Sequence, residues 1–134
     1  MNLSSNKDKI LVIDFGSQVT KLIARRIREY SVLSEVLTLK DLKKKNIFHN
    51  VKGIILSGGP STVTKSSFPK IPNKIFHLNI PILGICYGLQ LIVKQFNGIV
   101  KTNIKKREFG RVKLIKKKNS LLTKNFFNKN KSFV

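Results

Sequence analysis

The chain has 134 residues, and its 27 Lys and Arg residues against 6 Asp and Glu give a formal net charge of +21. This length suits one domain rather than two, and a hydrophobic fraction of 41% argues against a globally disordered chain. The basic residues are mostly lysines spread along the chain, with no RNP, zinc-finger or heptad pattern, so nucleic-acid binding is not expected despite the charge.

The first part of the chain predicts a strand, a helix and a second strand. Residues 10–13 form a short apolar run closed by residues 14–17, which is typical of a buried strand that ends in a turn. Apolar residues recur at helical spacing over residues 19–30, and Ser17 is the expected N-cap. Residues 32–39 predict the second strand. The residues expected on the apolar face of the helix are Val19, Leu22, Ile23, Ile27 and Tyr30.

Two further strands are predicted in the middle of the chain. Residues 53–57 form an apolar strand that stops at the Gly-Gly-Pro turn of residues 58–60. Residues 82–85 form another apolar strand, and a helical pattern follows at once over residues 89–96. Gly98 is well placed to end that helix.

Alternating strands and helices predict an α/β fold with a doubly wound, mostly parallel sheet. Its functional groups are expected on loops beyond the carboxyl ends of the strands. Residues 111–115 predict a later strand, whereas residues 116–134 form a poorly defined tail without a closing element, and residues 1–8 a flexible N-terminus. We therefore expect a single domain over residues 1–134 whose fold is incomplete at its C-terminal end.

The sharpest local motif is G-x-C-x-G at residues 84–88, between a predicted strand and a predicted helix. A lone cysteine in a core is most often a small apolar residue. Flanking glycines on a strand-to-helix turn instead favour a nucleophile presented above the sheet, and the helix N-terminus favours its thiolate. Cys86 is therefore the candidate nucleophile for attack on an amide carbonyl, expulsion of ammonia and hydrolysis of a thioester.

Such an attack creates an oxyanion that needs hydrogen-bond donors close by. The N–H of Tyr87, directly after the nucleophile, is one candidate. A second donor is expected from Gly58 or Gly59, because their turn ends the neighbouring strand; a bare turn is the alternative interpretation of this Gly-Gly-Pro stretch.

Four stretches together resemble the glutaminase domain of the GMP synthases, within the class I glutamine amidotransferases of flavodoxin-like fold. The resemblance covers roughly residues 9–115 and departs from the family pattern at Val19 and Lys21. The stretches are D-F-G-S-Q with L-I-A-R-R at residues 14–26, G-I-I-L-S-G-G-P-S at 53–61, G-I-C-Y-G-L-Q at 84–90 and R-E-F-G at 107–110.

The resemblance implies specific roles for residues of this chain. Cys86 would be the nucleophile, Gly59 and Tyr87 the oxyanion donors, and Gly58 and Gln90 contacts of the substrate glutamine. It also implies that the ammonia passes to an ATP pyrophosphatase domain or subunit that aminates XMP to GMP. ATP and Mg belong to that partner, so no cofactor and no metal is expected in this chain.

One part of the family's machinery has no counterpart in this sequence. The family triad also uses a histidine and a glutamate downstream of the cysteine, but no histidine follows Cys86. His49 and His77 precede it and are expected to be surface or packing residues. We therefore expect a truncated, catalytically incomplete glutaminase region, whether a fragment, a degraded gene or one piece of a split one. The alternatives are the glutaminase subunit of another class I amidotransferase and a non-catalytic remnant that binds glutamine or a partner.

The sequence shows no sign of export or membrane insertion. Residues 1–9 lack the apolar region of a secretory signal, and the longest apolar run, residues 80–93, is too short to span a bilayer. A single cysteine allows no intramolecular disulfide, which fits a reducing compartment. A cytoplasmic location without membrane contact is expected.

Overall fold

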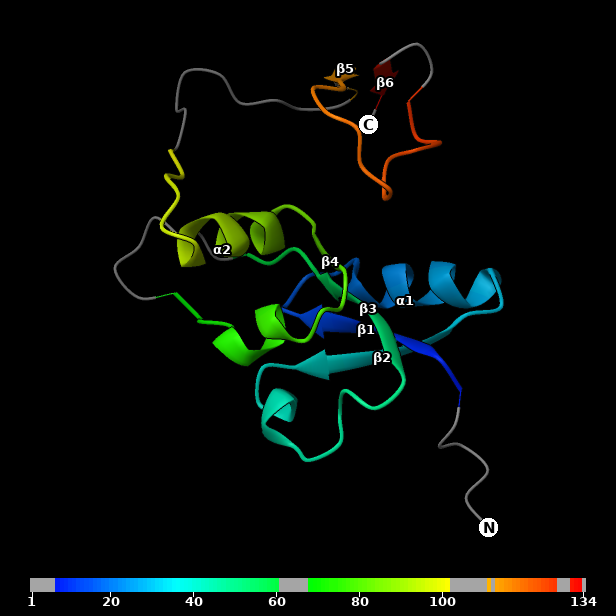
Figure 1. Cartoon of the computed structure of the whole chain (residues 1–134), viewed down its shortest axis with the longest axis vertical. Helices are drawn as coiled ribbons and strands as arrows, with labels where there is room; N and C mark the ends of the chain where they lie inside the picture. Colours follow the sequence, from blue (N-terminus) through cyan, green and yellow to red (C-terminus); the bar gives the residue numbers. More distant parts are fainter. Residues whose placement is uncertain (1–6, 61–67, 102–110, 112, 128–130, 134) are drawn as a thin grey trace. The chain divides into compact units, whose positions relative to one another are not determined.

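Figure 1 shows the computed structural model of the chain, which describes residues 7–60, 68–101, 111, 113–127 and 131–133. The chain divides into two compact units, residues 1–101 and 102–134. The interpretation of residues 1–134 as one domain stays a prediction. Most of the expected flexible N-terminus, residues 1–6, and the R-E-F-G stretch of residues 107–110 lie outside the described residues.

The first unit is built on a four-stranded parallel sheet with the strand order β2-β1-β3-β4. This order confirms the predicted doubly wound α/β fold, because the second strand lies on one side of the first and the later strands lie on the other. The strands are β1 (Lys9–Asp14), β2 (Leu33–Thr38), β3 (Val51–Leu56) and β4 (Ile82–Gly84), and the helices are α1 (Thr20–Glu29), α2 (Tyr87–Gln95) and the short 3-10 helices η1 (Asp41–Lys43) and η2 (Asn73–His77).

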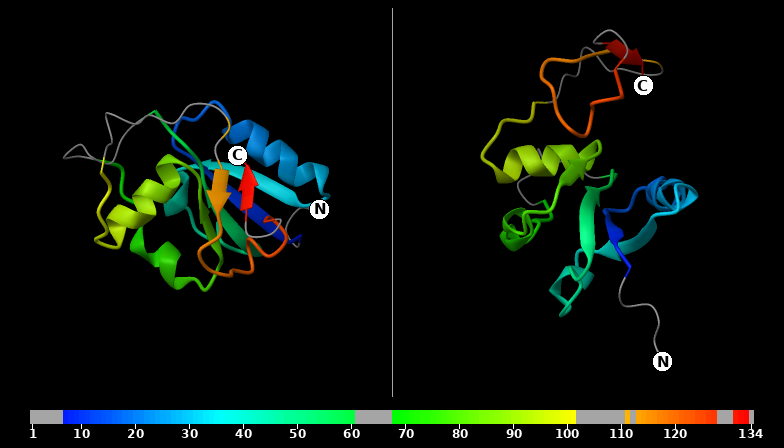
Figure 2. Two further views of the ribbon diagram at one scale, coloured as in Figure 1. Left: turned by 90° about the horizontal axis from the view of Figure 1, so that it is seen from above. Right: turned by 45° about the vertical axis from the view of Figure 1, so that its right-hand side comes forward.

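The helices α1 and α2 cover opposite faces of this sheet (Figure 2, right). The strand register shows why. Ser34, which bonds to α1, lies beside Ile10 of β1, whereas Leu56, which contacts α2, lies beside Ile13. Side chains alternate between faces along a strand, so positions 10 and 13 point to opposite sides.

The main hydrophobic core lies on the face covered by α2 and the two 3-10 helices. Each of these three helices contributes a buried side chain to it, so the sheet is closed there by several short segments. Its buried members are Leu11, Ile13, Leu37, Leu42, Ile47, Val51, Ile54, Leu56, Ile71, Ile75, Tyr87 and Leu91.

The start of α1 differs from the prediction that Ser17 caps it. The helix begins at Thr20, and its N-cap, Val19, makes no side-chain capping bond. The Ser17 hydroxyl instead accepts a hydrogen bond from the N–H of Val19 at 3.2 Å. Ser17 therefore stabilises the turn before the helix. Serine hydroxyls often accept a hydrogen bond in this way from the backbone N–H two residues later.

The buried side of α1 is narrower than the predicted apolar face. Thr20 and Ala24 are buried against the sheet, whereas 50% of Leu22 and 83% of Tyr30 are exposed. The helix packs against β1 and the edge strand β2, so only its small residues and the partly buried Ile23 and Ile27 face the sheet. A periodic pattern alone does not show how far the sheet extends under a helix.

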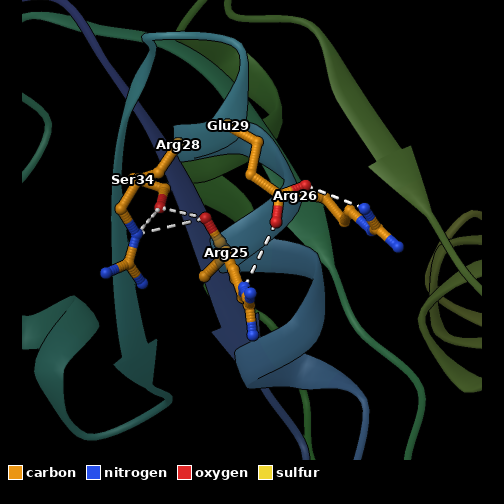
Figure 3. Close-up of polar contacts among 6 residues, drawn as sticks. Arg25, Arg26, Arg28, Glu29 and Ser34 are labelled. Atoms are coloured by element: carbon orange, nitrogen blue, oxygen red, sulfur yellow. Dashed lines mark hydrogen bonds and ion pairs between the residues drawn. The ribbon is translucent and has the colours of Figure 1, made fainter.

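A polar contact joins the last turn of α1 to β2 (Figure 3). The Ser34 hydroxyl donates to the carbonyl oxygen of Ala24 at 2.8 Å, and Arg28 Nε donates to the same carbonyl at 3.2 Å and to the Ser34 hydroxyl at 3.0 Å. Glu29 also pairs with Arg25 at 3.2 Å and with Arg26 at 2.8 Å. These outer pairs are exposed and contribute little to stability.

The second unit contains an antiparallel pair, β5 (Lys113–Ile115) and β6 (Lys131–Phe133), in which Leu114 lies opposite Ser132. The strand predicted over residues 111–115 is thus present over its last three residues. The tail of residues 116–134 was expected to lack a closing element, and the structure places β6 there, because pairing with β5 supplies hydrogen bonds that no local pattern reveals.

The turn after β2 is held by Asp41. Its Oδ2 accepts hydrogen bonds from the Thr38 N–H at 2.8 Å and the Thr38 hydroxyl at 2.7 Å, and its Oδ1 pairs with Lys44 Nζ at 2.5 Å. The hydrogen bond from Lys44, followed by those from Thr38, holds the pKa of the Asp41 carboxyl well below its usual range. The charged carboxylate therefore favours the turn that leads from β2 into η1.

We predict that replacing Gly88 by alanine destabilises the fold. A Cβ at Gly88 would lie 2.2 Å from the carbonyl oxygen of Leu56, a backbone atom that cannot move aside easily. The free energy of unfolding in urea should fall by at least about 1–3 kcal/mol. Gly58→Ala is the matched control, because the nearest atom to its Cβ would be at 3.5 Å. Equal stability of the two variants would contradict the tight packing of α2 on β3.

We also predict that Asp41 stabilises the fold only where its carboxyl is ionised. Because the folded-state pKa is lowered, this contribution is complete above the unfolded pKa of about 4 and is lost as the pH falls through the folded value. Urea unfolding of the chain and of Asp41→Asn should therefore differ most at neutral pH and converge in acid. A gap that stays constant between pH 7 and pH 2 would refute this role.

Candidate active site

Cys86 lies on a strained turn between β4 and α2, which confirms the predicted strand-to-helix context. Its backbone has φ 49° and ψ −110°, a region that residues with a Cβ rarely adopt. Such a conformation costs about 1–3 kcal/mol and persists only where the surrounding structure enforces it. The Cys86 thiol is free and exposed. The turn thus presents the sulfur at the N-terminus of α2.

The two glycines that flank Cys86 are required by close packing. A Cβ at Gly84 would lie 2.6 Å from the backbone of Leu89, and one at Gly88 would lie 2.2 Å from the Leu56 carbonyl oxygen. Both distances are far below a normal contact. A tight strand-to-helix turn of this kind needs residues without a side chain on either side of the nucleophile.

The glycine turn after β3 lies beside Cys86. The register pairs Leu56 with Gly84, and a Cβ at Gly58 would lie 3.8 Å from the Cβ of Cys86. Within the described residues, the N–H groups of Gly58, Gly59 and Tyr87 make no hydrogen bond. The stretch beside Cys86 and the residue after it therefore carry three unengaged backbone donors, of the kind that an oxyanion site requires. Their assignment to glutamine binding and to the oxyanion stays a prediction.

Tyr87 contributes its side chain to packing rather than to the polar surface. Its ring is 3% exposed and meets the Phe15 ring edge to face, with centroids 5.5 Å apart. The Tyr87 hydroxyl is buried and has no partner among the described residues, and burial raises the pKa of that hydroxyl. The ring also lies beside Gly59, where a Cβ would be 3.3 Å from Tyr87 Cδ1.

Gln90 follows in the first turn of α2. Its N–H donates to the carbonyl oxygen of Cys86 at 3.1 Å, so its backbone belongs to the regular helix. Its side chain is partly buried and makes no hydrogen bond with the described residues. This leaves the amide available to a ligand, and its contact with glutamine stays a prediction.

Neither histidine makes a hydrogen bond with the Cys86 thiol in the described part of the chain. His49 is exposed and precedes β3, whereas Cys86 lies near Leu56 at the other end of that strand. The length of β3 from Val51 to Leu56 is roughly 16 Å at about 3.3 Å per residue. His77 is exposed in η2, and its Nδ1 lies 2.9 Å from the carbonyl oxygen of Asn73. Both are surface residues, as expected.

Two buried hydroxyls that no sequence motif indicated connect the loops around the site. Thr20 is 1% exposed and Ser57 is fully buried, and their oxygens are 3.1 Å apart. Thr20 also donates to Asp14 Oδ1 at 2.8 Å. Thr20 and Ser57 are 37 positions apart, so no local pattern links them. Only the place of Ser57, directly before the paired glycines, could have drawn attention to it.

The described residues contain no group of three or more His, Cys, Asp or Glu side chains that could hold a metal ion. In the same ranges, no helix has the length and apolar character needed to cross a membrane.

Known proteins match this chain along most of its length. The family described as "Glutamine amidotransferase class-I" matches residues 11–134. A GMP synthase [glutamine-hydrolyzing] of Prochlorococcus marinus subsp. pastoris is 56% identical over 102 residues, which cover 76% of this chain and 19% of that protein. The protein of that name from Borreliella burgdorferi is 47% identical over 129 residues, covering 92% and 24%.

A solved structure from Thermoplasma acidophilum, described as one of the subunits of a GMP synthase, matches with a TM-score of 0.68 and 28% identity, covering 96% of this chain and 63% of that one. The chain spans about a fifth to a quarter of the length of these two curated relatives. The strained Cys86 turn, the sheet order and the family match agree. The chain belongs to the class-I family of glutamine amidotransferases.

Proposed function

We propose that this chain is the nucleophile-bearing part of the glutaminase domain of a GMP synthase. The observation that carries the proposal is Cys86, held at φ 49° between β4 and α2 beside the glycine turn after β3, whose N–H groups are unengaged in the described residues. This arrangement suits attack on a planar amide carbonyl, whose oxygen gains negative charge as the carbon becomes tetrahedral. The names of the curated relatives support glutamine as the amide and GMP synthesis as the use of its nitrogen.

In the proposed reaction, the thiolate of Cys86 forms a bond to the side-chain carbonyl carbon of glutamine. The N–H groups of Gly59 and Tyr87 stabilise the oxyanion, while Gly58 and Gln90 contact the substrate. The C–N bond then breaks and ammonia leaves with an added proton, which produces a thioester. Water hydrolyses that thioester to glutamate and restores the thiol.

The proton transfers need a base that the described residues do not place at Cys86. Such a group typically contributes about 10² to 10⁴-fold to the rate, because it activates the thiol and protonates the leaving ammonia. We therefore propose that the chain by itself is catalytically incomplete. The ammonia acceptor would be an ATP pyrophosphatase domain or subunit that aminates XMP with ATP and Mg, in the cytoplasm.

A second function is favoured because, in the described residues, neither His49 nor His77 makes a hydrogen bond with the Cys86 thiol. The chain would then bind glutamine or the synthetase partner without turnover. The Cys86→Ala variant separates this function from the first, because simple binding does not need the thiol.

We predict that the purified chain releases ammonia from glutamine at least about 10²-fold more slowly than an intact GMP synthase, with or without an ATP pyrophosphatase partner. Coupled measurement of ammonia would test this. Whatever release remains should disappear in Cys86→Ala, whereas Ser34→Ala, on the opposite face of the sheet, should retain it.

Release that persists in Cys86→Ala would contradict Cys86 as the nucleophile. Rapid Cys86-dependent release would instead show that the chain or its partner supplies a base. Glutamine binding by calorimetry that is equal in the chain and in Cys86→Ala, together with no release, would select the non-catalytic function.

A further inference from the structure

We propose that Ser57 is a positioning residue that fixes the direction of the Gly59 N–H and thereby the oxyanion site. This inference rests on the proposed function, because it assigns that N–H to the oxyanion. Ser57 directly follows β3, is fully buried, and is anchored by its own N–H, which donates to the Ile13 carbonyl oxygen at 3.1 Å. It is not one of the residues that the reaction itself touches.

The Ser57 hydroxyl holds three elements together. It accepts a hydrogen bond from the Phe15 N–H at 3.3 Å, and it lies 3.1 Å from the Thr20 hydroxyl and 3.0 Å from the carbonyl oxygen of Gly58. The Thr20 hydroxyl has a stronger acceptor in the Asp14 carboxylate at 2.8 Å. The single proton of Ser57 is therefore available to the Gly58 carbonyl.

A hydrogen bond to the Gly58 carbonyl also fixes the direction of the Gly59 N–H, which belongs to the same peptide. The described residues contain no cis peptide bond, so the carbonyl oxygen of Gly58 and the N–H of Gly59 lie on opposite sides of one peptide unit. A peptide between two glycines rotates more freely than others, because neither residue has a Cβ. The hydrogen bond from Ser57 limits that rotation and keeps the Gly59 N–H directed away from the buried hydroxyl.

The same turn is close to the nucleophile. A Cβ at Gly58 would be 3.8 Å from the Cys86 Cβ, so a rotation of this peptide would change the donors nearest the thiol. An oxyanion donor acts through its direction as well as its distance. A loss of the Ser57 hydroxyl should consequently affect reactions in which Cys86 develops an oxyanion more than reactions in which it does not.

Two alkylating reagents make this distinction measurable. A chloromethyl ketone analogue of glutamine places a ketone oxygen in the oxyanion position, and the Cys86 thiolate bonds to its methylene carbon as chloride leaves. Iodoacetamide reacts by the same displacement of a halide but needs no directed carbonyl. The ratio of their second-order rate constants, followed by mass spectrometry of Cys86, therefore reports the oxyanion site separately from the general reactivity of the thiol.

We expect Ser57→Ala to lower this ratio by about tenfold or more, since the loss of one oxyanion donor costs about 10² to 10³-fold in related sites. The iodoacetamide rate should stay within about twofold. Ser34→Ala is the matched control, because Ser34 is also buried and donates to a backbone carbonyl, at 2.8 Å, but lies under α1. Its ratio should equal that of the unchanged chain. An unchanged ratio in folded Ser57→Ala would overturn the inference.

A second measurement decides the case where Ser57→Ala does not fold or the unchanged chain shows no preference for the ketone. The NMR order parameter of the Gly59 N–H in the unchanged chain should be about 0.85, as for rigid backbone, and a value below about 0.6 would overturn the positioning role. A rigid Gly59 without preference for the ketone would refute the proposed function while the positioning of this peptide stands.

Discussion

The contact between Gly88 and the Leu56 carbonyl is the constraint on which the site depends. A Cβ at Gly88 would lie 2.2 Å from that oxygen, so α2 approaches the end of β3 as closely as backbone allows. The same approach places the start of α2 directly above β4, whose last residue, Gly84, pairs with Leu56. In the single turn between them, Cys86 adopts its strained conformation. The position of the thiol thus follows from backbone packing.

Small residues play a comparable part on the opposite face. The side chains of α1 that are buried there are Thr20 and Ala24. The carbonyl oxygen of Ala24 accepts a hydrogen bond from the Ser34 hydroxyl of β2. Because Thr20 is at the first position of α1, the helix starts where its hydroxyl meets Asp14 and Ser57. The start of the helix and the glycine turn after β3 therefore meet in one polar cluster, in which Thr20 donates to Asp14 and Ser57 donates to the Gly58 carbonyl.

The sequence predicted the features that local pattern determines. The strands at residues 10–13, 53–57 and 82–85 are confirmed, because continuous apolar runs are the mark of parallel strands covered on both faces. The turn around Cys86 is also confirmed. It could be predicted because Gly84 and Gly88 lie within two residues of Cys86 in the sequence. The assignment of Ser17 as the N-cap of α1 was wrong, and the exposure of Leu22 was not foreseen. Both depend on how the helix meets the edge of the sheet, which is a long-range property.

The site is divided in the same way between local and long-range causes. Cys86 and the N–H of Tyr87 come from one short stretch, whereas Gly58 and Gly59 come from a strand that ends about thirty positions earlier and reaches Cys86 through β3–β4 pairing. The proposed effect of Ser57 on Gly59 is less direct still. Ser57 bonds to the Gly58 carbonyl, which belongs to the same planar peptide as the Gly59 N–H. In the proposed glutaminase, the nucleophile can thus be read from a motif, but the direction of its oxyanion donor depends on a buried hydroxyl that touches neither the thiol nor the substrate.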